Sequence, residues 1–393
     1  MHSSNELYGS DRTLFDTVRT LDPVRFDPIV VLPSDGNGDG RLGDLLKDAG
    51  FTVHIMDLAV LRRRYLSPLG LLRLLVTAAA DVRRLGALMS KHSVQLCYSN
   101  SSAVISGSIA ARVYRVPHVW HVREIVAEPA FVGRALKWLI NNLSTDIIVV
   151  SDAVRVWLAP SRRPVDVIYH GLDDPIVDPA TRSRLRSELV NGRSGPLVGW
   201  VSRISTWKGH DTFVSMAELA AERFPQATFV LAGGPVPGLE TLASALNDRI
   251  NQSPYRDRIR YVGFRSDGPA LVAALDVLVA CPSRPDPFPR VVQEAMWQGV
   301  PVLATATGGL PELVSDGITG GLVHESGAVP LADRLGRMLD DPDGLARMAR
   351  ASRKLAEERY NMPQYVHRLE AIFDRALSAP ARQSGDRARD IAR

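Results

Sequence analysis

Residues 199–209 read Gly-Trp-Val-Ser-Arg-Ile-Ser-Thr-Trp-Lys-Gly, and a helical pattern follows over 211–223. The first residues are apolar and predict a buried strand, while the polar turn after it places two cations, Arg203 and Lys208, five positions apart. In an open α/β sheet, the turn from a strand into a helix is where phosphates bind, because the helix N-terminus is electropositive. The segment therefore predicts an α/β fold and an anion site at one rim of its sheet.

A plainer interpretation makes Arg203 and Lys208 solvated loop cations, and on this segment alone the two interpretations are about equally good. The background of basic residues favours the anion site. Lysine occurs only at positions 47, 91, 137, 208 and 354, against a large excess of arginine, so that Lys208 stands out from the rest of the chain.

The same alternation of short apolar runs with helical patterns continues along the chain, and it predicts parallel sheets covered by helices on both faces. The predicted strands are 28–32, 51–58, 94–98, 118–122, 146–150, 165–169, 197–201, 227–232, 260–262, 277–281 and 300–304. The rhythm occurs twice and is interrupted by a polar stretch, as expected for a chain that is too long for one core to keep growing.

The predicted organisation has two domains joined by a linker. It comprises an N-terminal Rossmann-like domain over 1–174, a linker over 175–195, a second Rossmann-like domain over 196–357, a helix over 358–377 that returns to the first domain, and a disordered tail over 378–393. The chain opens on Met-His-Ser-Ser without an apolar strand before its first Gly-containing turn. Since the first strand of a doubly wound sheet is central, we expect that strand to be truncated at the start of the sequence.

Composition restricts the class of protein. With 45% hydrophobic and 23% charged residues, a net charge of +4 and a pI near 9.2, the chain resembles an ordinary globular protein with a mild preference for anionic partners. Two distant cysteines exclude a disulfide framework or a zinc site, so that a cytoplasmic location is expected. No apolar run reaches the length of a membrane span, and no nucleic-acid-binding motif is present.

Residues 281–302 contain a second polar cluster between two predicted strands. Asp286 lies in a proline-stiffened loop, and Pro289 fits the first position of a short helix. On that helix Glu294 falls beside the apolar stripe, where its carboxylate could accept hydrogen bonds from sugar or ribose hydroxyls. The simpler alternative is an ion pair between Arg290 and Glu294, with Asp286 capping the helix.

Over 197–323 the ordered series of motifs resembles glycosyltransferase family 4. The motifs are the 199–209 turn, the Ala-Gly-Gly turn at 232–234, Val-Gly-Phe at 262–264, the Asp286-to-Glu294 segment and the glycine pairs at 308–309 and 320–321. The resemblance implies a GT-B architecture, in which two Rossmann-like domains face each other across a cleft. It also implies transfer of a sugar, with retention of anomeric configuration, from a nucleotide-sugar.

The resemblance assigns roles to individual residues. Arg203 and Lys208 match the clamp on the donor diphosphate, Glu294 matches the carboxylate that holds the ribose, and Asp286 stands where the family has a glutamate that contacts the transferred sugar. The chain also departs from the family at Pro289, where glycine is usual and where a backbone N–H donor is lost. The full predicted donor site comprises Gly9, Arg203, Lys208, Gly263, Phe264, Asp286, Phe288, Pro289, Arg290 and Glu294, with His121, Arg203, Lys208 and Asp286 as its catalytic members.

The N-terminal half resembles the family more weakly. Gly9 lies in a turn like the family's acceptor-side glycine-rich loop, where it would let the backbone approach the diphosphate. Residues 118–124 look like the strand that presents the active-site histidine, and by register this role falls on His121 rather than His118. His170 stands where the family's turn out of the first domain commonly has asparagine.

The expected reaction is same-face attack by an acceptor hydroxyl, assisted by the departing diphosphate, in cell-envelope or polysaccharide biosynthesis. No Asp-x-Asp metal motif lies near these residues, so that neither a metal nor any other cofactor is required. Expected partners are the UDP- or GDP-sugar and a glycan, lipid-linked or small-molecule acceptor. Arg62, Arg63 and Arg64 fit a peripheral contact with anionic lipid and, about equally well, an arginine-rich cap on a domain helix. The alternatives are a GT-B epimerase or phosphorylase, and a catalytically silent binding subunit.

Overall fold

The computed structural model describes residues 1–34, 40–62, 68–174 and 177–378. The chain divides into two compact units. Unit 1 comprises Met1–Val150, Arg155–Ile168 and the chain from Val366 onward, and unit 2 comprises Ser151–Val154 and Tyr169–Tyr365. Most of the predicted tail, as well as Arg63 and Arg64, lies outside the described residues. Among the described residues, no helix combines the length and apolar composition that crossing a membrane requires.

Unit 2 is built on one parallel sheet with the strand order β12-β11-β10-β7-β8-β9. Its strands are β7 (Leu197–Val201), β8 (Thr228–Ala232), β9 (Ile259–Tyr261), β10 (Val277–Ala280), β11 (Val302–Thr305) and β12 (Gly320–Val323). In chain order within the unit this arrangement is 3-2-1-4-5-6, the order of a doubly wound Rossmann sheet. The strand order reverses between the neighbouring strands β7 and β10.

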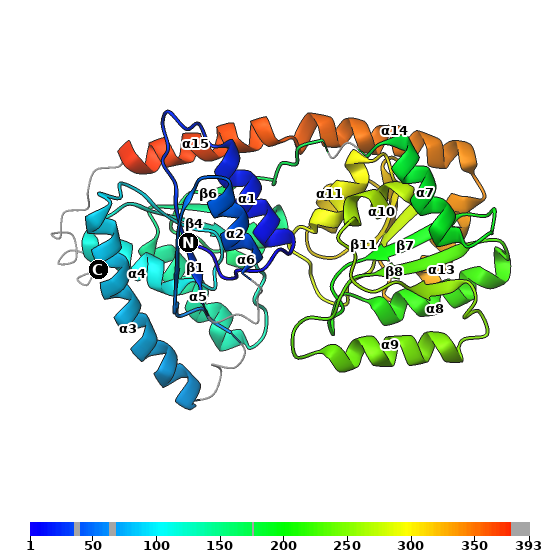
Figure 1. Ribbon diagram of the computed structural model, residues 1–393, viewed down its shortest axis with the longest axis horizontal. Helices are drawn as coiled ribbons and strands as arrows, with labels where there is room; N and C mark the ends of the chain where they lie inside the picture. Colours follow the sequence, from blue (N-terminus) through cyan, green and yellow to red (C-terminus); the bar gives the residue numbers. More distant parts are fainter. Residues whose placement is uncertain (35–39, 63–67, 175–176, 379–393) are drawn as a thin grey trace. The chain divides into compact units, whose positions relative to one another are not determined.

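Alternate side chains of these strands enter two separate cores, as a sheet covered on both faces requires. Leu197, Val230 and Leu278 belong to one core, and Val198, Phe229 and Val277 to the other. Figure 1 shows the helices of the two cores on opposite faces of the sheet. The helices of unit 2 are α7 (Pro179–Val190), α8 (His210–Arg223), α9 (Glu240–Gln252), α10 (Gly268–Ala274), α11 (Arg290–Trp297), α12 (Leu310–Leu313), α13 (Ala328–Leu339) and α14 (Pro342–Arg359).

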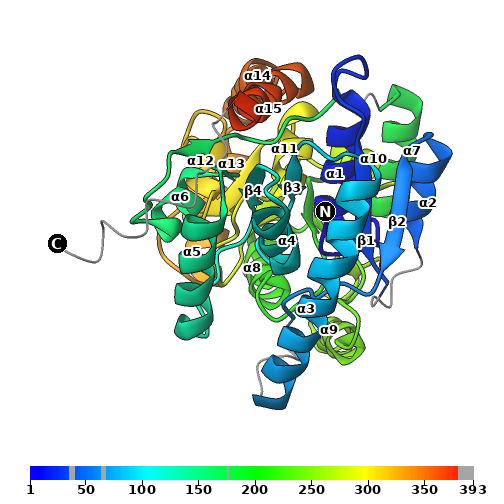
Figure 2. The ribbon, with the colours of Figure 1, turned by 90° about the vertical axis from the view of Figure 1, so that its left-hand side faces the viewer.

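Unit 1 contains two parallel sheets, β1-β2 and β3-β4-β5-β6. The strands are β1 (Ile29–Pro33), β2 (Thr52–Met56), β3 (Cys97–Ser99), β4 (His118–Val122), β5 (Asp146–Val149) and β6 (Val165–Val167). The first residues of the chain lie between the two sheets, as Figure 2 shows. The backbone N–H of His2 donates to Val31 O at 3.1 Å, and that of Asn100 donates to Met1 O at 2.9 Å. The central position of the unit is thus occupied by a short segment that is not a strand.

Helices cover both faces of unit 1 as well. They are α1 (Gly9–Thr20), α2 (Arg41–Asp48), α3 (Pro68–Lys91), α4 (Ile105–Tyr114), α5 (Ala130–Leu143), α6 (Asp152–Leu158) and α15 (Met362–Ser378), and the first residues of α6 and of α15 belong to unit 2. The last helix joins unit 1 from the far end of the chain. Arg375 Nε donates to Asp146 Oδ1 at 2.7 Å, and the ring of Phe373 contacts that of Tyr98 with centroids 5.4 Å apart.

The expectation of a linker over 175–195 needs correction, because most of this stretch forms α7. Leu185 and Leu189, spaced by one helical turn, are fully buried in a core of unit 2. At the surface of the helix, Arg186 Nη2 donates to Asp276 Oδ2 at 2.7 Å. The polar composition that suggested a linker belongs to the remaining, solvent-facing surface of an amphipathic helix.

Candidate functional site

The loops at the carboxyl edge of the unit 2 sheet contain the predicted donor-site residues of this unit that precede α11. Arg203 and Lys208 follow β7, Gly263 and Phe264 follow β9, and Asp286 follows β10. Because β7 and β10 are neighbours and parallel, the loops after them emerge at the same edge, at the point where the strand order reverses. Ligands of open α/β sheets bind at this position.

Lys208 and Asp286 meet at this point of reversal. Lys208 Nζ lies 2.5 Å from Asp286 Oδ2, and both side chains are largely buried. Two further contacts fix the lysine, since its ammonium lies 4.3 Å from the centroid of the Trp207 ring and its backbone oxygen accepts a hydrogen bond from Trp200 Nε1. Asp286 therefore pairs with Lys208, which corrects the alternative in which it caps the helix after it.

Glycines bring the backbone close around this pair. Gly209 (φ 82°) precedes α8, and a Cβ at this position would lie 1.9 Å from Cys281 O. Gly308 (φ 59°) follows β11, where a Cβ would lie 2.1 Å from Asp286 O. The backbone N–H of Gly309 donates to Asp286 O at 2.8 Å. The loops after β7, β10 and β11 are thus packed against one another, with no room for larger residues at these positions.

Helix α11 begins at Arg290, one residue later than predicted. Pro289 is its N-cap and is extended, with φ −71° and ψ 115°. Val292, Ala295 and Met296 are buried and Glu294 is half-buried beside them, as the apolar stripe predicts. Arg290 Nε donates to Glu294 Oε1 at 3.0 Å, so that the ion pair weighed as an alternative does form.

Several contacts around α11 could not be recognised from the sequence. Phe288 stacks on Tyr169 with ring centroids 5.3 Å apart. The buried Gln293 side chain donates to His170 O at 2.5 Å, and Arg290 Nη1 lies 3.4 Å from His170 Nε2. The only sign of this contact in the sequence is a glutamine on the helix. Its partner, His170, lies more than a hundred positions earlier, so that no local pattern connects the two residues.

Arg203 and Phe264 are exposed, with 59% of Phe264 accessible to solvent. Gly263 (φ 68°) has open space where a Cβ would stand, and Gly233 N donates to Gly263 O at 2.8 Å. The loops after β8 and β9 are therefore held together by their backbones. An exposed aromatic ring beside an open glycine is a suitable surface for a flat base.

The predicted residues of unit 1 lie in two places. Gly9 is the exposed first residue of α1. His121 is fully buried on β4, where its Nδ1 lies 2.6 Å from Tyr98 Oη and its Nε2 has no hydrogen-bond partner among the described residues. Burial, together with the nearby Arg123 cation, holds the pKa of His121 well below its usual value, which keeps the imidazole neutral.

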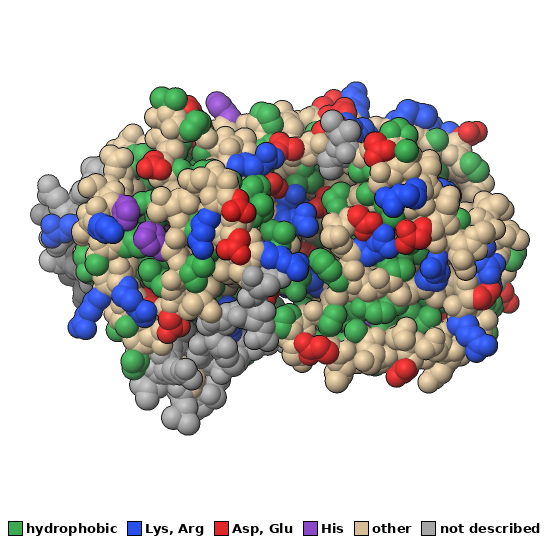
Figure 3. Space-filling view, viewed as in Figure 1, with side chains coloured by type: hydrophobic (Ala, Val, Ile, Leu, Met, Phe, Trp, Pro, Cys, Tyr) green, Lys and Arg blue, Asp and Glu red, His purple; other side chains and the backbone are tan. Residues whose placement is uncertain are grey.

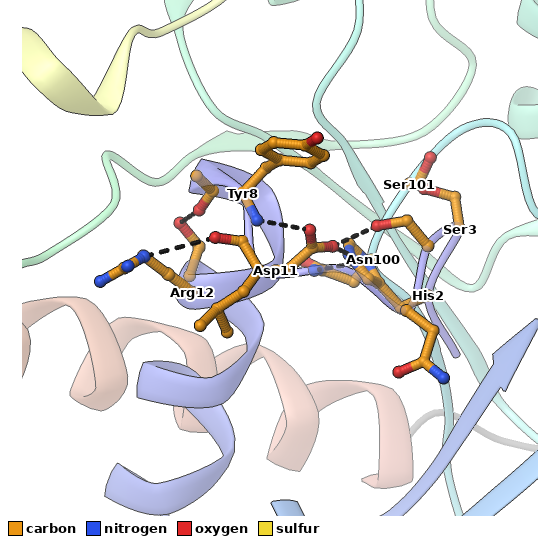
Figure 4. Close-up of polar contacts among 12 residues, drawn as sticks. His2, Ser3, Tyr8, Asp11, Arg12, Asn100 and Ser101 are labelled. Carbon is orange, nitrogen blue, oxygen red and sulfur yellow. Dashed lines mark hydrogen bonds and ion pairs between the residues drawn. The ribbon is translucent and has the colours of Figure 1, made fainter. Parts of the chain in front are cut away.

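Polar side chains form a network at the start of α1, and Figure 4 shows part of it. Asp11, at the start of α1, accepts hydrogen bonds from His2 Nε2 at 2.7 Å and from the backbone N–H of Tyr8 at 2.8 Å. Burial opposes the charge of Asp11, yet these hydrogen bonds outweigh it and lower the pKa of the carboxyl group. Beyond His121, Glu124 accepts from the hydroxyl of Ser102 at 2.7 Å.

Over the face drawn in Figure 3, Lys and Arg side chains are interspersed with Asp and Glu side chains. Many of the arginines are paired, as Arg265 is with Glu188 and Asp267. Among the described residues, no group of three or more His, Cys, Asp or Glu side chains is placed to hold a metal ion.

Comparison with known proteins matches residues 182–355 to the family model "Glycosyl transferases group 1". Over 315 residues the chain is 32% identical to the alpha-D-kanosaminyltransferase of Streptomyces kanamyceticus, a match that covers 74% of this chain and 78% of that protein. It is also 32% identical over 273 residues to the D-inositol 3-phosphate glycosyltransferase of Salinispora tropica. That match covers 65% of this chain and 54% of the relative, so that the chain spans about half the length of relatives of this kind.

Among solved structures, Anabaena HepE in complex with UDP-glucose resembles the chain with a TM-score of 0.79 and 27% identity. The likeness covers 95% of this chain and 98% of that one. The predicted GT-B class, with two Rossmann-like units, is confirmed by this likeness and by the strand order of unit 2.

Proposed function

Because the chain belongs to the glycosyl transferases group 1 family, we propose that it transfers a sugar from a nucleotide-sugar to a hydroxyl group of an acceptor. The Lys208–Asp286 pair at the reversal point of the unit 2 sheet is the observation that carries this proposal. It combines a cation for a diphosphate with a carboxylate for sugar hydroxyls at the edge where such sheets bind nucleotides.

In the proposed reaction, the bond between the anomeric carbon and the diphosphate oxygen breaks, and a bond from the acceptor oxygen forms on the same face. The acceptor proton passes to the departing diphosphate, so that no carboxylate nucleophile is needed. Arg203, Lys208 and the N-terminus of α11 oppose the negative charge that builds on the leaving group. Removing one such group typically lowers the rate by about 10²–10³-fold.

The remaining predicted residues receive supporting roles in this proposal. Glu294 binds the ribose hydroxyls through carboxylate lone pairs that the hydrogen bond from Arg290 Nε leaves available. Phe264 and Gly263 accept the base, Gly9 approaches the diphosphate, and His121 positions the transferred sugar. Retention of configuration, independence of metal ions and the family 4 assignment are parts of the same proposal.

A hexose donor linked to UDP is the first candidate, since the similar Anabaena structure is in complex with UDP-glucose. The acceptor is proposed to be a glycan, a lipid-linked molecule or a small molecule, and the last of these is supported by the name of one relative, D-inositol 3-phosphate glycosyltransferase. A role in envelope or polysaccharide synthesis, in the cytoplasm at the inner membrane face, stays a prediction.

Binding and product analysis test the proposal together. UDP-, GDP- and ADP-sugars are screened by thermal shift, because a ligand at 100 times its Kd stabilises the protein by about 2.7 kcal/mol. The stabilising donor is then incubated with acceptor panels, and the products are identified by mass spectrometry and NMR. A new α- or β-glycoside is expected, with the anomeric configuration of the donor. An epimerised donor, or a free sugar phosphate as product, would establish the epimerase or phosphorylase alternative instead.

A further inference from the structure

A continuous chain of hydrogen bonds runs through unit 1 from Asp11 to His121. His2 Nε2 lies 2.7 Å from Asp11 Oδ1, and His2 Nδ1 lies 3.2 Å from Asn100 Nδ2. Asn100 Oδ1 lies 3.1 Å from Tyr98 Oη, which in turn lies 2.6 Å from His121 Nδ1. Figure 4 shows the part of this hydrogen-bond series in which His2 lies between Asp11 and Asn100.

The direction of each hydrogen bond follows from one residue that can only donate. Arg123 Nη1 lies 3.2 Å from the Asn100 side chain, and a guanidinium has no acceptor atom. The atom of Asn100 that faces Arg123 must therefore be the carbonyl oxygen, which leaves the amide NH₂ facing His2. His2 Nδ1 then accepts, and its Nε2 carries the proton that is donated to Asp11.

The same reasoning applies toward His121. Tyr98 Oη faces the carbonyl oxygen of Asn100, which can only accept, so that the phenolic proton is donated to Asn100. The phenolic oxygen is then the acceptor for His121 Nδ1–H. In the neutral imidazole only one nitrogen holds a proton, so that Nε2 is left with a free lone pair.

We propose that Tyr98 and Asn100 are positioning residues that fix His121 in the Nδ1–H tautomer, with Nε2 as an acceptor for a substrate hydroxyl. The proposal rests on the proposed function for the identity of the ligand, because a sugar supplies hydroxyl donors. Nε2 is buried and has no hydrogen-bond partner among the described residues, which is unusual for a polar atom in a protein interior. A phosphate or carboxylate oxygen is excluded as its partner, since neither has a proton to donate at neutral pH.

Two substitutions separate this tautomer lock from ordinary packing. Tyr98→Phe keeps the ring against Phe373 and removes the oxygen that accepts from Nδ1, so that both tautomers become available to His121. Asn100→Leu removes the carbonyl that takes the phenolic proton. The Tyr98 hydroxyl then donates to Nδ1 and forces the proton onto Nε2.

Matched controls are present in the chain. Asn100→Asp keeps oxygen acceptors for both Tyr98 and Arg123, so that it should preserve the tautomer of His121. Tyr114→Phe removes the hydroxyl of a tyrosine on α4 that is 41% exposed, without touching the network. Thermal unfolding of each variant verifies that it is folded.

The tautomer is measured directly by nitrogen-15 NMR of histidine-labelled full-length protein, before any substrate is added, and His121→Gln identifies the signals. We expect only the Nδ1–H form in the native protein, in Asn100→Asp and in Tyr114→Phe. A mixture is expected in Tyr98→Phe, and the Nε2–H form in Asn100→Leu. An Nε2–H form in the native protein, or an unchanged tautomer in Tyr98→Phe, overturns the proposal; if Asn100→Leu fails to fold, Tyr98→Phe alone decides.

Kinetics with UDP-glucose as the donor probe give the functional readout. In Tyr98→Phe the kcat for release of UDP should fall by about tenfold, the equivalent of one ordinary hydrogen bond, with little change in KM. Tyr114→Phe should match the native enzyme. If the NMR shows the predicted tautomers but no sugar is transferred from any donor, the lock stands and the proposed function fails; a native kcat in a Tyr98→Phe protein with mixed tautomers overturns the role of the lock in positioning.

Discussion

Lys208 and Asp286, 78 positions apart in the sequence, form an ion pair with 2.5 Å between Nζ and Oδ2. Each follows one of two adjacent parallel strands, so that the pair marks the reversal point of the sheet. The carboxylate of Asp286 orients the Lys208 ammonium before a diphosphate binds. Substitutions at the two positions test whether the ammonium moves from the carboxylate to the diphosphate.

Replacing Lys208 by alanine should lower kcat/KM by about 10²–10³-fold, because the diphosphate loses a point charge and Asp286 is left unpaired. Steady-state kinetics with the donor identified by the screen measure this loss. Lys354→Ala is the matched control, since Lys354 is an exposed helical lysine that pairs with Glu358. Equal activity of the two variants would contradict the role of Lys208.

Asp286→Asn should separate binding of the diphosphate from turnover. Removing the carboxylate charge frees Lys208, so that UDP should bind about fivefold more tightly, or by about 1 kcal/mol, the size of one solvent-screened charge interaction. Sugar transfer should nevertheless fall, because the carboxylate proposed to contact the sugar is gone. Calorimetric titration with UDP and steady-state rates test the two halves; weaker binding of UDP would refute the competition between Asp286 and the diphosphate.

Gly308→Ala should distort the loop that holds Asp286. The new Cβ would lie 2.1 Å from Asp286 O, in addition to the cost of a positive φ for alanine. Gly317→Ala shares the positive φ (73°) but has open space around the new methyl group. In urea unfolding, Gly308→Ala should be less stable than Gly317→Ala by about 2 kcal/mol, the cost of overpacking. Activity should fall only in Gly308→Ala, and equal losses in both would show that only φ matters.

The stability of unit 1 should depend on pH through its buried histidines. Burial lowers the pKa of His118 to about 3, while an exposed histidine in the unfolded chain titrates near 6.5. Between these values the unfolded state binds the proton and the native state does not, so that stability is full above pH 6.5 and falls as the pH is lowered toward 3.

Each such histidine contributes a slope of about 1.4 kcal/mol per pH unit within this window. His118→Phe keeps an aromatic ring beside Trp120, but the new side chain cannot bind a proton. The free energy of unfolding of this variant should therefore change with pH less steeply than that of the native protein, by the slope of one histidine. Urea unfolding at pH 4.5, 5.5 and 7 provides the comparison. Parallel curves for the native protein and the variant would show that His118 is not neutral in the fold.

The alternation of apolar runs predicted the eleven strands from 29 to 305 within a few residues, because parallel strands buried on both faces are apolar throughout. Strand β12 was seen only as a glycine motif, since Gly320 and Gly321 have no side chains to produce a pattern. Helix α7 was hidden because only Leu185 and Leu189 of its twelve residues are buried.

The site residues close to a strand end were the easiest to predict, since their strands set their positions. Contacts such as Gln293 with His170, or Arg123 with Asn100, depend on the folding of separate segments against each other. No local pattern in the sequence distinguishes these polar residues from others that face solvent. The tautomer of His121 could therefore be inferred only from the three-dimensional network.

Helix α15 packs on unit 1 through Phe373, Arg375 and the carboxylates of Glu370 and Asp374, which pair with Arg25. During synthesis on the ribosome, the rest of unit 1 has been made once residue 168 is added, but the C-terminal segment that completes it begins only at Val366, about 200 residues later. At about 5–20 residues per second the wait is roughly 10 to 40 seconds. Unit 2 ends at Tyr365, so that unit 1, although most of it is made first, is finished last, and the ring of Tyr98 has no contact with Phe373 until then.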